Sequence, residues 1–263
     1  MPPYPQAESE ETGLYATLLQ TYLDDTGLVD YRGLKANREG LDLFASRLRD
    51  LDGTVYENWT DQHKIAFWLN AYNSLTLRLI IDHYPIKSSF IKSLRYPKNS
   101  IRQISGGWDR IAFPVMGRPL TLNQIEHNIL RARFSEPRIH MALVCASRSC
   151  PKLRQDPYTA ENLEAQLQDQ TRAFLRSEDN FSINRQKGEV YLSSIFKWFK
   201  EDFQSTEGPS PKLTGQTQAM SAVLVFVSRH VSEELRRYLL EARYNVKFLP
   251  YDWSLNERPK NLP

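Results

Sequence analysis

Side chains suited to proton transfer and nucleophilic attack are concentrated in residues 120–153. This segment reads LTLNQIEHNILRARFSEPRIHMALVCASRSCPKL and contains Glu126, His140, Cys145 and Cys150. A thiol beside a histidine is the usual source of a reactive thiolate at neutral pH, and a carboxylate on the far ring nitrogen orients the imidazole. We therefore predict a thiol-dependent centre in which Cys145 attacks a carbonyl, His140 moves the proton and Glu126 orients His140.

The sequence predicts that Glu126 points into the protein. Thr121-x-x-Gln124 is a capping-box pattern that starts a helix to about residue 132, and Glu126 shares a helix face with Leu122 and Leu130. A buried carboxylate needs a hydrogen-bonding or cationic partner. Two interpretations stay open: an orienting group for His140, or a structural ion pair with an arginine.

His140 lies in the apolar run at 139–144, whose β-branched residues favour a buried strand. A histidine in such a run is most often a satisfied core residue. Cys145 follows five positions later, so on a regular strand the two side chains would point to opposite faces, roughly 16 Å apart. A direct pair of His140 and Cys145 therefore requires a bulge or a sharp turn before the cysteine.

Cys150 is a second thiol candidate. Pro151 suits the first position of a helical turn, and a helix N-terminus lowers the pKa of a cysteine. The short gap to Cys145 also allows the two sulfurs to pair reversibly, which would make a redox switch. We assign Cys150 to the substrate or oxyanion side of the site.

Two amides, Asn70 and Asn73, lie three positions apart on the strongest predicted helix, which we expect to be buried. Buried amides usually hold neighbouring backbone, and the functional alternative is a polar wall or an oxyanion donor. Zinc is a rival from another class, because Glu126, His140 and the two cysteines are zinc-compatible ligands. Neither C-x-x-C nor H-E-x-x-H occurs, so we predict no metal and no cofactor.

Composition sets limits on the protein class. The 263 residues include 34 basic and 31 acidic side chains without long runs of one sign, so we predict no nucleic-acid partner. No stretch of about 18 apolar residues occurs, which predicts no transmembrane segment. The start MPPYPQAESEE lacks the features of a signal peptide, so we expect a soluble chain and leave its compartment open.

Hydrophobic periodicity predicts many helices and few strands. The expected helices cover about 14–23, 34–48, 60–84, 121–132, 159–175, 193–203, 216–228 and 232–243, with hairpins at 111–120 and 181–192 and a last strand at 246–249. This arrangement predicts an α+β fold, mostly helical, with a small antiparallel sheet. We expect a mobile segment at 1–12 and a single globular domain at 13–263.

Several strings resemble one known family, the domain of unknown function 547. They are ValAspTyr at 29–31, AlaPheTrpLeuAsnAlaTyrAsn at 66–73, LeuAsnGlnIleGlu at 122–126, ArgIleHis at 138–140, CysAlaSerArgSerCysPro at 145–151, PheLysTrpPhe at 196–199 and TyrAspTrpSerLeuAsn at 251–256. The resemblance implies a Glu-His-Cys triad of Glu126, His140 and Cys145. The chain order Glu, His, Cys is not a circular permutation of the Cys, His, acid order of papain-like enzymes.

The sequence leaves two functions open. The first is a cysteine-peptidase-like hydrolase or acyl transferase acting on a peptide or on a small thiol or amide substrate. The second is a non-catalytic binding domain in which the same residues form a rigid, buried polar network.

Overall fold

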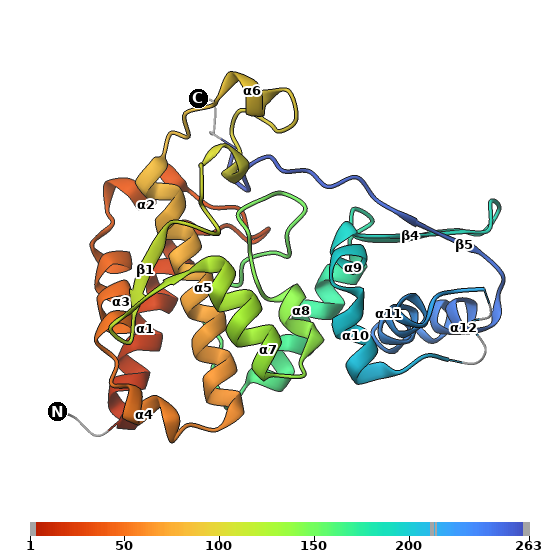
Figure 1. The fold of residues 1–263 in the computed structure, drawn as a ribbon, viewed down its shortest axis with the longest axis horizontal. Coiled ribbons are helices and arrows are strands. Elements are labelled where there is room, and N and C mark those ends of the chain that lie inside the picture. The colour runs from red at the N-terminus through yellow and green to blue at the C-terminus, as the bar shows by residue number, and fades with distance from the viewer. Residues whose placement is uncertain (1–3, 211–212, 214, 260–263) are drawn as a thin grey trace.

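The computed structural model describes residues 4–210, 213 and 215–259. It is an α+β fold dominated by helices, as predicted (Figure 1). The first part of the chain contains α1 (Tyr4–Tyr22), α2 (Tyr31–Ala36), α3 (Glu39–Asp50), α4 (Gly53–Glu57), α5 (Asp61–His83), α6 (Phe90–Ser93), η1 (Ile101–Gln103), β1 (Ala112–Val115), β2 (Arg118–Thr121), η2 (Gln124–Leu130), α7 (Arg131–Arg133) and η3 (Pro137–Met141). Helix α1 thus includes residues 4–12 of the predicted N-terminal segment.

The second part begins with α8, which runs from Leu163 to Arg176. It continues with β3 (Phe181–Asn184), β4 (Glu189–Leu192), α9 (Ser194–Trp198), α10 (Lys200–Glu207), α11 (Gln218–Arg229), α12 (Glu233–Glu241) and β5 (Asn245–Phe248). Strands β3 and β4 form the predicted antiparallel hairpin, but β5 pairs with β4 in parallel. This three-stranded sheet is therefore mixed, while β1 and β2 form a separate, small antiparallel sheet. Helices α11 and α12 lie between β4 and β5, and they provide the long connection that a parallel pair requires.

Helix α5 is the centre of the first core, as its sequence predicts. Thr60 caps it by accepting a hydrogen bond from the His63 amide, and the helix ends just before Pro85. Buried side chains cover nearly every face of α5, and Leu69 and Tyr72 are almost completely inaccessible to solvent. An apolar helix of this kind is stable in water only when other elements surround it.

Three of the predicted elements were wrong. The single helix expected at 193–203 is divided at Phe199 into α9 and α10. The single helix expected at 34–48 is broken into α2 and α3, because the backbone of Asn37, with φ −130° and ψ 63°, leaves the helical region. The strand expected at 139–144 is instead the 3₁₀ helix η3, followed by irregular chain. Its polar backbone groups are satisfied without a strand partner, since the Asn73 side chain bonds to Ala142 and Val144.

The core has two parts, and α8 and η3 belong to both. The first part is built around α5, while the second packs α9, α10 and α11 against the β3–β4 hairpin. In η3, Ile139 belongs to the first part and Met141 to the second; in α8, Leu167 and Phe174 are divided in the same way. Among the described residues, no helix is long and apolar enough to cross a membrane.

Candidate functional site

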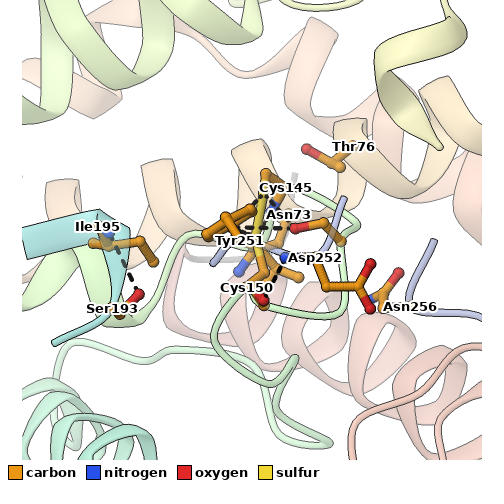
Figure 2. Close-up of a disulfide and its surroundings, with 12 residues drawn as sticks. Asn73, Thr76, Cys145, Cys150, Ser193, Ile195, Tyr251, Asp252 and Asn256 are labelled. Atoms are coloured by element: carbon orange, nitrogen blue, oxygen red, sulfur yellow. Dashed lines mark hydrogen bonds between the residues drawn. A yellow bond between two sulfur atoms is a disulfide. The ribbon is translucent and has the colours of Figure 1, made fainter. Parts of the chain in front are cut away.

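Cys145 and Cys150 form a disulfide at the junction of the two core parts, with their Cα atoms 6.1 Å apart (Figure 2). The hydroxyl of Tyr251 lies against both sulfurs, 3.3 Å from Cys145 Sγ and 3.2 Å from Cys150 Sγ. Ser147 Oγ is 3.3 Å from Cys145 Sγ. The structure therefore holds the cysteines as an oxidised pair, the alternative that the short spacing left open, and not as free thiols.

The position of Cys145 is set by Asn73 on α5. The Asn73 amide donates to the Ala142 carbonyl at 3.0 Å and accepts from the Val144 amide at 2.9 Å, so it fixes the backbone just before the cysteine. Ala146 then adopts a positive φ of 56°, and the chain turns back toward Cys150. Cys145 is half-buried whereas Cys150 is buried, so Cys145 is the more exposed residue of the pair.

His140 is held by Asp202 of α10. Its Nε2 lies 2.8 Å from Asp202 Oδ2, and its ring stacks on Phe199 with the centroids 4.1 Å apart. Burial lowers the pKa of His140, and the nearby Asp202 carboxylate opposes that shift. The same carboxylate accepts two hydrogen bonds from Arg131, at 2.6 and 2.8 Å. No hydrogen bond in the described part of the chain joins His140 to Cys145.

Glu126 lies on η2, and its carboxylate accepts a hydrogen bond from the Tyr72 hydroxyl at 3.1 Å. Burial raises its pKa to about 7, although the Tyr72 hydrogen bond and the Arg131 charge lower it. Asp202, and not Glu126, is the carboxylate in contact with His140. The predicted contact between Glu126 and His140 is thus replaced by a contact between His140 and Asp202, which lies on α10, 62 positions after His140.

Glu126 connects two groups of polar residues. On one side, its charge interacts with Arg131 and with Asp202, the residue that binds His140. On the other side, its charge interacts with Tyr72 and with Tyr251, and Tyr251 contacts Cys145. The three residues predicted from the sequence are therefore parts of one electrostatic network at the junction, without direct hydrogen bonds between them. Ligand sites commonly form where two parts of a fold meet.

An aromatic cluster lies next to the disulfide on the side of Tyr251. The Tyr251 ring is 4.6 Å from that of Trp253 and 4.8 Å from that of Trp198, measured between centroids. The Arg102 guanidinium stacks 4.4 Å from the Trp253 ring, and its charge interacts with Tyr251. Trp198 is 43% exposed, so part of this cluster is open to solvent.

A cavity of about 570 Å³ borders the other side of the disulfide. Its wall includes Ser147, Cys150 and Asp252 on one side and the C-terminal part of α8 on the other. Asn180 also lines it, and the Asn180 Oδ1 atom is buried without a hydrogen-bond partner. This space is large enough for a small ligand beside the sulfur pair.

The remaining candidate residues have structural contacts. Asn70 bonds to both the carbonyl and the amide of Tyr158, as Asn73 does to the chain before Cys145. Within the described ranges, no group of three or more His, Cys, Asp and Glu side chains is arranged to hold a metal ion. The four residues that the sequence offered for zinc are not gathered into one such group.

Four contributors to the network were missed in the sequence: Tyr72, Arg131, Asp202 and Tyr251. Tyr72 and Tyr251 lie in two of the strings that carry the family resemblance, so those strings contained a usable signal. Asp202 follows the aromatic residues Phe196 and Phe199, but no pattern in the sequence connects it with His140. Only the packing of α10 on η3 does so.

The raised pKa of Glu126 gives a testable prediction for stability. A carboxyl group whose folded pKa is about 7, against an ordinary value of 4.5, stabilises the fold fully below pH 4.5 and loses that contribution as the pH rises through 7. The difference corresponds to about 3 kcal/mol. We expect Glu126→Gln to remove this loss, so that the free-energy difference between variant and wild type grows by about 3 kcal/mol from pH 4.5 to 8.

Urea unfolding at several pH values measures this difference. The comparison with wild type is essential, because the lowered pKa of the buried His140 gives the opposite trend in both proteins. Parallel pH profiles for the two proteins would contradict the assignment of a neutral, buried Glu126.

Residues 56–175 match one family model, described as protein of unknown function, DUF547. The match includes Glu126, His140 and both cysteines, and it ends before Asp202 and Tyr251. It confirms over this range the family expected from the sequence. Searches of curated proteins and of solved structures found no match.

Proposed function

Residues 56–175 of this chain match the DUF547 family model, and from that premise we propose that the chain is a thiol-dependent hydrolase or acyl transferase with Cys145 as the nucleophile. One observation carries the proposal: the half-buried Cys145 sulfur touches the Tyr251 hydroxyl, and the charge of Glu126, whose pKa is about 7, acts on that hydroxyl. A nucleophile and a group that exchanges protons near neutral pH therefore share one network.

The proposed reaction starts with reduction of the disulfide. A thiol reductant attacks the sulfur of Cys145, the more exposed residue of the pair, and Cys150 leaves as a thiolate. The Cys145 amide donates to Cys150 Sγ at 2.9 Å and the Tyr251 hydroxyl donates to it at 3.2 Å, so both donors favour the departing negative charge. A second thiol releases Cys145 as a free thiol and takes the reductant away as a disulfide.

The reduced Cys145 then attacks the carbonyl carbon of an ester, thioester or amide. A sulfur–carbon bond forms, the bond to the leaving group breaks, and the proton lost by the thiol passes to the leaving alcohol, thiol or amine. Water hydrolyses the resulting thioester and frees Cys145, or an acceptor amine or thiol takes the acyl group. A peptide or a small thiol or amide compound has the required carbonyl.

Glu126 is the proposed proton acceptor. A carboxyl group with a pKa of about 7 is close to half ionised at neutral pH, which is the condition under which general acid–base catalysis is most effective. Two hydroxyls lie between the thiol and this acceptor: that of Tyr251, which contacts Cys145, and that of Tyr72, which donates to Glu126. His140, held by Asp202, is proposed as a positioning residue that keeps α10 and Asp202 near Glu126.

A second candidate function is a binding domain without catalysis. It is favoured by the contacts of His140, whose buried side chain is both stacked and hydrogen-bonded, as in a structural network. In that case the cavity beside Cys150 would hold a ligand that is not changed.

Covalent trapping tests the proposed function. The chain is incubated with p-nitrophenyl acetate before and after treatment with dithiothreitol, and modified peptides are identified by mass spectrometry. We expect one acetyl group, on Cys145, only after reduction. The control is the reduced chain in urea, where both thiols lose the environment of the fold. Equal rates in the folded and unfolded chains, or acetylation of Cys150 instead, would contradict the proposal.

A further inference from the structure

Three large apolar side chains lie in solvent at one end of the molecule. Phe90 is 84% exposed, Ile91 76% and Leu94 78%, although most other apolar residues of the chain are buried. All three lie on the short helix α6 or directly after it. In Figure 1, α6 projects from the body of the protein, away from the second core part. Neighbouring exposed apolar side chains of this size indicate a surface that contacts another body.

The segment that carries these residues, 86–98, is fixed by hydrogen bonds to residues 103–105. The buried side chain of Gln103 accepts from the Ser89 amide at 3.0 Å and donates to the Pro97 carbonyl at 3.0 Å. Lys92 Nζ bonds to the Gln103 carbonyl and to Ser105 Oγ. The apolar tip is therefore presented by a fixed scaffold and is not a loose loop.

Within residues 83–108 the charge has one sign, while Glu257 of the C-terminal segment bonds to Asn99 next to this region. Between Asp82 and Asp109 the sequence contains no acidic residue, whereas it contains five basic ones, namely Lys87, Lys92, Arg95, Lys98 and Arg102. Lys87, Arg95 and Lys98 are exposed. A group of apolar side chains surrounded by cations matches a membrane interface, where acyl chains lie below anionic headgroups.

We propose that residues 86–98 dock this protein onto the surface of an anionic lipid membrane. Phe90, Ile91 and Leu94 enter the boundary between headgroups and acyl chains, and Lys87, Arg95 and Lys98 contact the phosphates. The positive charge within the segment itself favours lipid over a protein partner, because an apolar groove on a protein would need only the three apolar side chains. This inference goes beyond the proposed thiol chemistry and does not depend on it.

Co-sedimentation with vesicles tests the proposal with the full chain. We expect at least about tenfold more binding to vesicles that contain phosphatidylglycerol than to phosphatidylcholine alone, and a loss of binding in high salt. Either triple substitution, Phe90→Ser with Ile91→Ser and Leu94→Ser, or Lys87→Glu with Arg95→Glu and Lys98→Glu, should lower binding by a similar factor. Leu43→Ser is the matched control, since Leu43 is 48% exposed on α3, outside this segment.

Other outcomes would overturn the inference. They are equal binding to both kinds of vesicle, unchanged binding by the serine variant, or self-association of the wild type that the serine variant abolishes, which would mean a contact between copies. If a triple variant does not fold, Phe90→Trp replaces it: fluorescence at position 90 should be quenched by brominated lipids in anionic vesicles. An unquenched signal, measured against the wild-type background, overturns the proposal as well.

Discussion

Replacing Cys145 with serine is expected to lower the rate of acylation of the reduced chain by at least about 1,000-fold. A serine hydroxyl has no appreciable ionised form at neutral pH, whereas a thiol is partly ionised and intrinsically more nucleophilic. The effect is measured as the initial rate of p-nitrophenol release from an activated ester, together with the mass of the modified peptide.

Cys150→Ser is the matched control for that experiment. It removes the disulfide partner but keeps Cys145, so the rate should stay near that of the reduced wild type and should no longer need a reductant. Retained reactivity in Cys145→Ser, or a loss in Cys150→Ser equal to that in Cys145→Ser, would contradict the assignment of Cys145 as the nucleophile.

Much of the fold could be predicted because it depends on local signals. The capping box at Thr121 and Gln124 forms both of its reciprocal hydrogen bonds, at 2.9 and 3.1 Å. Helix α5 follows from apolar residues on every face between Thr60 and Pro85. These features need only contacts within a few residues of the chain, which a sequence pattern records directly.

The errors arose where a distant side chain decides the backbone. The run at 139–144 has the composition of a strand, but the Asn73 amide on α5 binds its backbone groups and leaves it irregular. The partner of His140 was misassigned for the same reason. Glu126 is nearer in sequence, yet α10 brings Asp202 within 2.8 Å of the imidazole. Long-range packing of this kind has no signature in residue spacing.

Asp202→Ala is expected to lower the free energy of unfolding at pH 7 by about 3 kcal/mol. The Asp202 carboxylate binds Arg131 at two points and His140 at one, and its pKa is held well below the usual range by these partners despite the opposing effect of burial. Its loss leaves the buried His140 nitrogen and the Arg131 guanidinium without their acceptor. Urea unfolding measures the change, and Glu201→Ala, at an exposed position on the same helix, should stay within about 0.5 kcal/mol of wild type.

The same Asp202→Ala variant separates the two candidate functions. Because its carboxylate is ionised only above its lowered pKa, the stabilisation is present above the ordinary pKa of aspartate, near 4, and disappears as the pH falls through the folded value. The wild-type advantage over Asp202→Ala should therefore shrink in acid. If Asp202→Ala is less stable but its reduced Cys145 is acylated as fast as in wild type, the pair of Asp202 and His140 is purely structural. If acylation slows as well while the variant remains folded, the pair positions the network of Glu126 and Cys145 for chemistry, and the catalytic proposal gains a second, independent support.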